Sequence, residues 1–293
     1  MPVLHAPAAP GPIRRLWDEA DAVQRAALLI GVVLLVLAVL APWLAPVDPN
    51  KQSLIARFRP PLGFAGARPG HWLGTDELGR DILSRGLHGL GLTLMLAALG
   101  ATLGLMIGGT LGLLAGVVGG RTQAAIMGAV DTQIAVPFTL IALFVLTVFG
   151  STLTVLVVVL GLYGWEQYAR IVRAEAARLM TLPFIEAARC AGASPVRIAL
   201  THVLPNLVSP LVVQFTPSLS NIILLESTLS FLGLGVQPPT ATLGAMVGVG
   251  RDFMPTAPWI VLVPAALILA VTFSIQILGD WLRDRADVRL RRR

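Results

Sequence analysis

The chain has 293 residues, of which 55% are hydrophobic and 13% are charged, and its formal net charge is +6 at pH 7. Its mean hydropathy of +0.78 excludes one or two soluble globular domains and indicates a single polytopic membrane domain. The basic balance does not indicate nucleic-acid binding, because the Lys and Arg residues lie mostly beside apolar segments, where they set topology and contact lipid headgroups. The single cysteine, Cys190, excludes an intrachain disulfide.

The N-terminal part begins with a polar tail, residues 1–25. Residues 26–46 follow as an apolar run of about the length that the hydrocarbon core of a membrane requires. This run is too long for the apolar region of a signal peptide and lacks a small-residue cleavage site, so we expect an uncleaved transmembrane helix. Residues 47–86 then form a polar loop with Pro-rich and Gly-rich parts.

The second predicted span, Gly91–Val118, carries a glycine at every fourth position. These glycines are Gly100, Gly104, Gly108, Gly112 and Gly116, with Gly120 just beyond the span. Glycines at this spacing line one helix surface and allow a neighbouring backbone to approach closely. We therefore expect them to serve helix packing, and we favour this over a role in a pore.

Four further spans complete a prediction of six transmembrane helices. They are Ala124–Phe149, Thr152–Gly164, Leu207–Leu225 and Pro258–Leu278. The second of these four is short, and we expect its helix to continue past Trp165. The other three contain prolines, which should kink the helices while neighbouring helices satisfy the freed carbonyl groups.

The basic residues predict the orientation of the chain. If both termini are cytoplasmic, most of the 22 Lys and Arg residues lie on the cytoplasmic side, as the positive-inside rule requires. Residues 87–280 are then the core transmembrane domain, and residues 281–293 form a basic cytoplasmic tail. The same orientation places the polar segment 183–205 in the cytoplasm and the loop 47–86 on the other side.

The segment 183–205 reads as an elbow of two short helices. Pro183 suits the first turn of a helix, and Gly192 is placed to end it because glycine adopts the left-handed conformation without steric cost. Ser194 and Pro195 then suit the N-cap and first residue of a second helix, which we expect to run to Leu204-Pro205. These local signals fit a docking elbow and an ordinary interhelical loop equally well.

The sequence shows no catalytic or metal-binding pattern. The four histidines are far apart and none has metal-ligand spacing, and neither a phosphate-binding loop nor a nucleophile elbow occurs. We therefore expect no bound cofactor or metal and no ATP site in this chain. Asp131 and Glu226 are the carboxylates at or near apolar spans, which makes them candidates for a translocation path. Their position near span ends would equally allow them to reach water.

A resemblance to a known family rests first on the elbow. Glu186-Ala187-Ala188, Gly192 and Leu204-Pro205 are similar to the EAA motif of binding-protein-dependent ABC importer permeases. His202 departs from the general pattern, which has isoleucine there. The run His202-Val203-Leu204-Pro205-Asn206 instead resembles the peptide/nickel branch of that family.

Other motifs resemble the C-type permease subunit of dipeptide and oligopeptide systems, and together they cover nearly everything from residue 26 to the C-terminus. They are Leu73-Gly74-Thr75-Asp76 with Gly79-Arg80-Asp81, Tyr168-Ala169-Arg170 with Val172-Arg173-Ala174-Glu175, Glu226-Ser227 through Leu229-Ser230-Phe231-Leu232-Gly233-Leu234-Gly235, Pro238-Pro239, and Gly279-Asp280 with Leu282-Arg283-Asp284.

The resemblance implies a type I ABC importer permease fold in the cytoplasmic (inner) membrane of a bacterium. It implies a B-type permease as heterodimer partner, two ABC ATPases that bind ATP and Mg, and an extracytoplasmic substrate-binding protein. The solute would be a dipeptide or oligopeptide, or alternatively nickel or another small solute. In this picture the permease itself is not an enzyme, and membrane lipid surrounds it.

The resemblance also implies roles for individual residues. The first elbow helix would be the helix that couples the permease to an ATPase, with Glu186 making charged contacts and Ala187 and Ala188 leaving room for close approach. Gly192 would set the bend, and Leu204-Pro205 would fix the start of the fifth span. Thr75, Asp76, Arg80 and Asp81 are candidates for the outer gate or for contact with the binding protein, although a structural turn would use the same residue types.

Two other function classes fit the sequence less well. A secondary transporter driven by an ion gradient would favour buried carboxylates or histidine relays and paired half-sequences of inverted topology. An intramembrane enzyme would need a nucleophile with a base, or a metal set, within its spans. The sequence shows neither arrangement.

Overall fold

The computed structural model describes residues 20–286, and all the regular secondary structure in this range is helical. The helices are α2 (Ala22–Val39), α3 (Ala41–Leu44), η1 (Leu54–Ala56), α4 (Ile82–Val118), α5 (Gly120–Ala135), α6 (Phe138–Phe149), α7 (Leu153–Gly161), α8 (Trp165–Leu179), α9 (Pro183–Cys190), α10 (Pro195–Ile198), the π-helix η2 (Ala199–Val203), α11 (Leu204–Phe231), α12 (Leu243–Gly250), η3 (Arg251–Phe253) and α13 (Trp259–Ala286). The N-terminal tail up to residue 19, and the C-terminal residues 287–293, lie outside the described residues.

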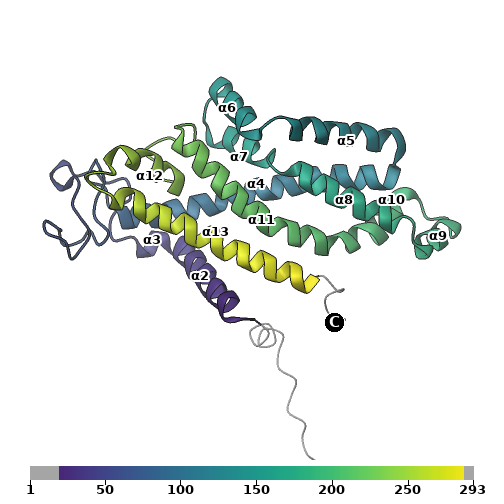
Figure 1. The fold of residues 1–293 in the computed structure, drawn as a ribbon, viewed down its shortest axis with the longest axis horizontal. Helices are drawn as coiled ribbons and strands as arrows, with labels where there is room; N and C mark the ends of the chain where they lie inside the picture. The colour runs from purple at the N-terminus through teal and green to yellow at the C-terminus, as the bar shows by residue number, and fades with distance from the viewer. Residues whose placement is uncertain (1–19, 287–293) are drawn as a thin grey trace, which may run out of the picture.

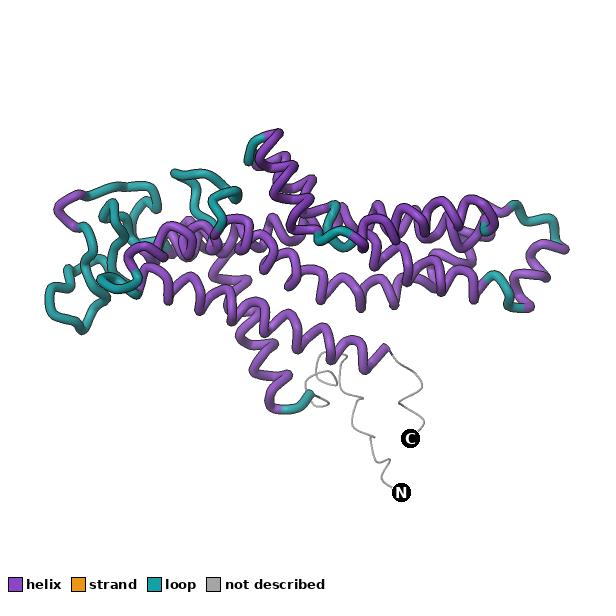
Figure 2. The backbone as a smooth tube through the Cα atoms, turned by 45° about the horizontal axis from the view of Figure 1, so that its top comes forward, coloured by secondary structure: helices purple, strands orange, loops and turns teal. Residues whose placement is uncertain are grey.

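The molecule is an elongated bundle with α4 running along most of its length (Figure 1). The connection 45–81, which we call the long loop, lies at one end, and α9 lies at the opposite end (Figure 1). Figure 2 shows that irregular backbone gathers chiefly at the long-loop end. We refer to these two ends as the loop end and the elbow end.

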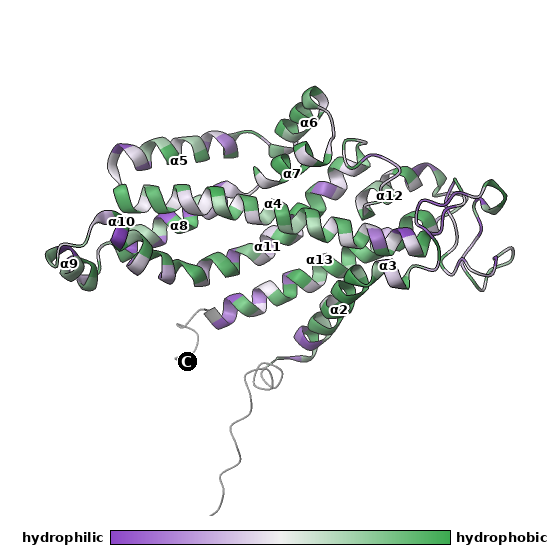
Figure 3. Ribbon diagram, turned by 180° about the vertical axis from the view of Figure 1, so that it is seen from behind, coloured by the Kyte–Doolittle hydropathy of each residue, from purple (hydrophilic) through white to green (hydrophobic). Residues whose placement is uncertain are grey.

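Five helical segments in the described range are long and apolar enough to cross a membrane, and the bent pair α5–α6 would provide a sixth. Figure 3 shows that hydrophobic residues dominate α2 and much of α11 and α13. Large apolar side chains such as Leu35, Leu269 and Phe273 are exposed on these helices, as expected for surfaces that contact lipid. The prediction of an all-α polytopic membrane protein is confirmed.

The first span begins earlier than the sequence predicted. Helix α2 starts at Ala22 because Asp21 and Gln24 form a capping box, in which the Gln24 amide donates to Asp21 Oδ1 at 2.7 Å and the Asp21 amide donates to Gln24 Oε1 at 3.0 Å. The helix ends at Val39 and the short α3 follows. The predicted bounds 26–46 are therefore too late at both ends.

The second span also begins earlier than predicted. Helix α4 starts at Ile82, where Asp81 Oδ2 accepts a hydrogen bond from the Ser84 amide at 2.8 Å and so caps the helix. The last residues of the predicted loop 47–86 are thus helical, and the helix begins nine residues before the predicted start at Gly91. The predicted end at Val118 is correct.

The third span is broken, whereas the sequence predicted one kinked helix over Ala124–Phe149. Helices α5 and α6 meet at Val136 and Pro137 with a bend of 85°. Pro137 cannot donate a backbone hydrogen bond, and it disfavours helical geometry at the preceding residue, so the helix stops instead of bending. The fourth span does continue past Trp165 as predicted, through a short break at 162–164 between α7 and α8.

The fifth span is longer than predicted. The structure joins α10, η2 and α11 into one helical segment, Pro195–Phe231, so the second elbow helix does not end at Leu204-Pro205. The π-helical turn η2 ends at Val203, two residues before Pro205. A wider turn there removes the need for the amide that Pro205 lacks and relieves the clash of its ring with the preceding turn.

The sixth span is α13, and a short helix that the sequence did not predict, α12, precedes it. Helix α12 lies beside α11 and α13 near the loop end (Figure 1). The central core of the bundle is built from buried residues of several spans. Its members include Leu90, Leu96, Ala142, Leu146, Leu156, Leu160, Ile222, Ile223 and Leu243.

Candidate functional site

The elbow is attached to the bundle by a small apolar cluster of its own. Ile185 of α9, Ile198 of α10 and Val203 of η2 are buried in it. The other buried members are Val172, Ala176 and Leu179 of α8 and Leu207 of α11. This cluster fixes α9 in a position where it projects beyond the ends of α8 and α11 (Figure 1).

The predicted motif residues lie on and beside the free face of α9. Pro183 occupies the first turn of the helix as predicted, and Glu186 follows in the same turn. Glu186 and Ala187 are exposed, whereas Ala188 is half-buried against the apolar cluster. A carboxylate in the first turn suits the positive end of the helix dipole. The exposed residues of α9 therefore include the charged Glu186 and Arg189 beside the very small side chain of Ala187.

Gly192 ends α9 in the way that the sequence predicted. Its φ is +81°, the Ala193 amide donates to Ala188 O at 3.0 Å, and the Gly192 amide donates to Arg189 O at 2.9 Å. This pair of hydrogen bonds defines a Schellman motif. A Cβ added at Gly192 would meet nothing within 4 Å, so glycine is required here for its backbone conformation and not for space.

The second elbow helix starts at the predicted residues. Ser194 Oγ accepts a hydrogen bond from the Arg197 amide at 3.3 Å, and Pro195 is the first helical residue. His202 lies in the π-helical turn, where its ring packs against Phe184 of α9 with 6.3 Å between ring centroids. The contact joins the two helices of the elbow across the bend.

The glycines of α4 lie against α7 and α8. A Cβ at Gly108 would lie 2.1 Å from Trp165 O, and one at Gly112 would lie 2.6 Å from Ala169 O. Gly100, Gly104 and Gly116 make similar close approaches to the same two helices. Gly120 differs, because it begins α5 with a positive φ. We call this contact the α4–α8 seam.

The charged residues at the end of the long loop are buried and bonded to one another. Asp76 is 4% exposed. Its Oδ1 accepts the amides of Leu78 and Arg80, each at 2.9 Å, and its Oδ2 accepts Arg80 Nε at 2.6 Å. Arg80 Nη2 also donates to Glu77 Oε1 at 2.7 Å, and Arg85 Nε lies 3.6 Å from Asp76 Oδ2. The cluster thereby pins the loop to the first turn of α4.

Thr75 and Asp81 extend this cluster. The Thr75 hydroxyl accepts the Arg59 amide at 2.8 Å and donates to Ala56 O, which closes the long loop on itself. Asp81 Oδ1 lies 3.0 Å from His71 Nδ1, while its Oδ2 caps α4. The four predicted residues Thr75, Asp76, Arg80 and Asp81 are therefore brought together. Their polar groups are occupied within the loop, as a structural turn would have them.

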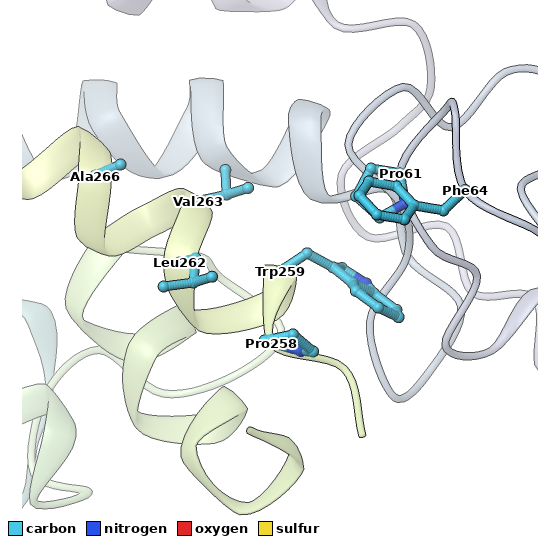
Figure 4. Close-up of a pocket in the computed structure, with 7 residues that line it drawn as sticks. All are labelled: Pro61, Phe64, Pro258, Trp259, Leu262, Val263 and Ala266. Atoms are coloured by element: carbon cyan, nitrogen blue, oxygen red, sulfur yellow. The ribbon is translucent and has the colours of Figure 1, made fainter. Parts of the chain in front are cut away.

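An apolar cavity of about 420 Å³ lies where the long loop meets α13 (Figure 4). It is lined by Pro61, Phe64, Pro258, Trp259, Leu262, Val263 and Ala266. Trp259 closes one side and is held there because its Nε1 donates to Thr75 O at 3.1 Å. The lining side chains carry no charge, so the cavity offers little to fix a polar solute.

The two predicted translocation carboxylates differ in their surroundings. Asp131 of α5 is exposed and its Oδ1 lies 2.6 Å from Arg170 Nη2 of α8, with side chains 66% and 49% exposed respectively. Glu226 of α11 is only 1% exposed. Its Oε1 accepts the Ser230 hydroxyl at 2.7 Å. The expectation that Glu226 could reach water near a span end is wrong, because α12 covers it.

A polar network between α5 and α8 was missed by sequence reasoning. Gln133 Oε1 accepts Trp165 Nε1 at 2.6 Å, and Gln133 Nε2 donates to Leu162 O and to Glu166 Oε2 at 2.9 and 3.1 Å. It bridges the two helix breaks, at 136–137 and 162–164. Glycine at 164 followed directly by Trp165-Glu166 is a helix-start signal that could have revealed it.

Comparisons with known proteins bear on the whole chain. Residues 108–288 match the family model described as "Binding-protein-dependent transport system inner membrane component", and residues 25–61 match "N-terminal TM domain of oligopeptide transport permease C". A di/tripeptide transport system permease protein of Pseudomonas aeruginosa is 38% identical over 96% of this chain and 94% of its own length. The dipeptide transport system permease protein DppC of Escherichia coli is 35% identical over 99% of this chain and 97% of its own length.

The fold is also found among solved structures. A chain from the MetNI methionine ABC transporter in an inward-facing conformation superimposes with a TM-score of 0.53 at 20% sequence identity. The match covers 68% of the present chain and 95% of that chain. It supports the helical arrangement alone, because identity this low carries no information on the solute.

Proposed function

The chain belongs to the family of binding-protein-dependent transport system inner membrane components, and on that premise we propose that it forms half of the path of an ATP-driven importer of di- or oligopeptides. The peptide assignment rests on the names of relatives that match nearly the full chain. Within this proposal the chain binds no nucleotide, and ATP with Mg is hydrolysed in partner subunits.

The partners follow from the same proposal. A B-type permease completes the path as a heterodimer, two ABC ATPases supply the energy, and a substrate-binding protein delivers the peptide at the loop end. The exposed Asp131–Arg170 pair supports a polar environment for α5 and α8, because an exposed ion pair is unfavourable against lipid. We assign this face of α5 and α8 to the path or to the partner permease.

The elbow carries the proposal. A short helix projects from the end of the bundle, is anchored from beneath by Ile185, and exposes Glu186 and Ala187. A rigid surface that combines the small Ala187 with the charged Glu186 and Arg189 suits insertion into a groove on another protein, because its backbone is already ordered before binding. We propose that α9 is the coupling helix and that Gly192 holds its angle to α10.

The proposal also assigns orientation and location. We place the elbow end in the cytoplasm and the loop end outside the inner membrane of a bacterium, with both termini cytoplasmic. Residues 87–280 then act as the core transmembrane domain. Cysteine labelling of Trp72→Cys, on the exposed part of the long loop, with a membrane-impermeant reagent tests this orientation, in a Cys190→Ser background.

The central experiment is uptake by the reconstituted complex of both permeases, both ATPases and the binding protein. We expect uptake of a labelled dipeptide that needs ATP and stops when the ATPases are inactivated. Uptake of nickel instead of peptide would change the proposed solute but leave the proposed subunit architecture unchanged. Gradient-driven uptake by this chain without ATPases would overturn the proposal and favour a secondary transporter.

A further inference from the structure

Helix α12 covers the side chain of Glu226. Gly244 and Gly248 bring α12 directly onto α11, since a Cβ at Gly244 would lie 2.5 Å from Ser227 Cα and one at Gly248 would lie 2.9 Å from Ser230 O. Gly244 and Gly248 therefore place no side chain of α12 between the two helices at this contact. The short helix is docked on α11 as closely as two backbones allow.

Glu226 of α11 lies beside the start of α12. Its Oε2 is buried without a hydrogen-bond partner in the described structure and is 3.2 Å from the position that a Cβ of Gly244 would take. Gly244 is in the first turn of α12, whose amides carry the positive end of the helix dipole. The carboxylate thus faces the helix terminus, the Ser230 hydroxyl and the side chain of Thr242, the N-cap of α12, and no basic side chain in residues 20–286 forms a salt bridge with it.

The start of α12 also contacts α4. The Leu243 amide donates to Thr93 Oγ1 at 3.1 Å. At 1.5 Å per residue, Thr93 lies about 16 Å along α4 from Ile82. Glu226 is a buried carboxylate within a helix that is apolar enough to span a membrane, where an ionisable group is costly and rarely serves packing alone.

Glu226 is directly connected to the elbow through a single helical segment. Residues 195–231 form one continuous helix, about 55 Å long at the usual rise. A displacement of the elbow is thereby transmitted to the contact between α11 and α12. The start of α12 contacts two side chains, Glu226 on α11 and Thr93 on α4. When α11 and α4 move apart, α12 should stay with the helix whose contact is the stronger.

We propose that Glu226 is a positioning residue that ties α12 to α11, so that α12 moves with α11 when the ATPases displace the elbow. This inference rests on the proposed function, because the elbow must be the point where the ATPases act. The loss of this tie would leave ATP hydrolysis and α11 movement intact but would leave α12 behind. Peptide would then fail to move in step with hydrolysis.

The test uses the assembled complex and a Cys190→Ser background with spin labels at Val249→Cys on α12 and Met95→Cys on α4, both exposed positions. The label–label distance is measured with and without ATP and vanadate. We expect an ATP-dependent change in distance, which Glu226→Gln abolishes because the neutral amide lacks the negative charge that the α12 terminus attracts. Transport per ATP should fall about tenfold, a typical size for a coupling between sites.

Thr93→Val is the matched control, because it removes the competing anchor on α4 while keeping the side-chain shape. We expect it to retain the distance change. If Glu226→Gln prevents assembly, Ser230→Ala keeps the carboxylate but removes the hydroxyl that orients it, and it should reduce the distance change by a smaller factor.

The outcomes separate this inference from the proposed function. A distance change in the parent complex without peptide uptake would reject the peptide assignment and leave the role of Glu226 standing. An unchanged distance response in Glu226→Gln, or no response in the parent complex, would overturn the role of Glu226. A parallel fall in ATP hydrolysis, transport and folded protein would show that Glu226 is structural only.

Discussion

The loop end and the elbow end are both polar stretches between apolar helices, and they use their charges differently. At the loop end, Asp76, Arg80 and Asp81 are buried and bonded to one another and to the backbone. At the elbow end, Glu186 is exposed on a helix that projects from the bundle. Polar motifs of similar appearance in sequence thus divide into one that closes the chain on itself and one that remains available to a partner.

The two regions differ because the polar groups of the long loop have partners within the chain, whereas the exposed face of the elbow has none within residues 20–286. The long loop folds back over the start of α4, so its charges can be satisfied within the chain. The elbow is an anchored turn whose two helices are held from beneath, by Ile185 and Ile198. Its outer face is left without neighbours from the same chain. The exposed charge of the elbow, on a rigid helix, is better suited to docking than the buried ion pairs of the long loop.

The largest effect should come from opening the loop-end cluster. Asp76→Ala leaves Arg80 and Arg85 buried without their shared carboxylate and should lower the free energy of unfolding by about 3–5 kcal/mol. Thermal unfolding of the purified protein in detergent measures this change. The exposed Asp252, 3.5 Å from Arg251, supplies the control, and Asp252→Ala should change stability by less than about 0.5 kcal/mol. A stable Asp76→Ala variant that loses only its binding-protein contact would make the loop a docking surface and break the comparison.

The second effect tests the seam that supports the elbow. Gly108→Ala should destabilise the protein by about 1–3 kcal/mol, because its Cβ would collide with Trp165 O and force α8 away from α4. The adjacent Gly109 is in the same helix and faces open space, so Gly109→Ala should be neutral or slightly stabilising. The measurement is the thermal unfolding midpoint of the Gly108→Ala and Gly109→Ala variants. Equal effects at both positions would mean that the seam does not depend on close backbone approach.

A smaller effect is expected at the bend of the elbow. Gly192→Ala should cost about 1–2 kcal/mol because alanine disfavours the left-handed conformation, and Gly192→Asn should cost less although asparagine is larger. The measurement is unfolding of each variant together with its ATPase association. A cost that rises with side-chain size instead would show that space, and not backbone conformation, limits this position.

Local signals in the sequence predicted the elbow well. Pro183, Gly192, Ser194 and Pro195 all occupy their expected helix positions, because caps and first-turn residues depend on the immediate chain. The number of apolar spans was equally accessible, since hydropathy reflects composition over a short window. The assigned role of the elbow in coupling remains a prediction.

Other features depended on contacts between distant residues. Pro205 lies inside a continuous helix because a π-helical turn accommodates it, whereas Pro137 breaks its helix by 85°. Pro137 lies within an apolar segment and Pro205 directly before one, and the local sequence around each does not distinguish the outcomes. Helix α12 and the burial of Glu226 also depend on glycines that meet α11 from a separate segment. No local pattern records such pairings.

The smallest effect on stability should accompany the largest effect on coupling. Glu186 is exposed, so Glu186→Lys should change the free energy of unfolding by less than about 0.5 kcal/mol beyond a small loss of helix-dipole interaction. Co-purification of the ATPases and ATP-driven uptake should nevertheless fall strongly, because the charge on the docking face is reversed. Glu175→Lys, on α8 where Arg178 Nε donates to the carboxylate at 3.0 Å, reverses a charge away from that face. It should leave ATPase association intact. Both lysine variants could instead assemble and transport like the parent complex. The exposed charge at the elbow end would then contribute no more to docking than the buried charges at the loop end, and exposure alone would not identify a docking surface.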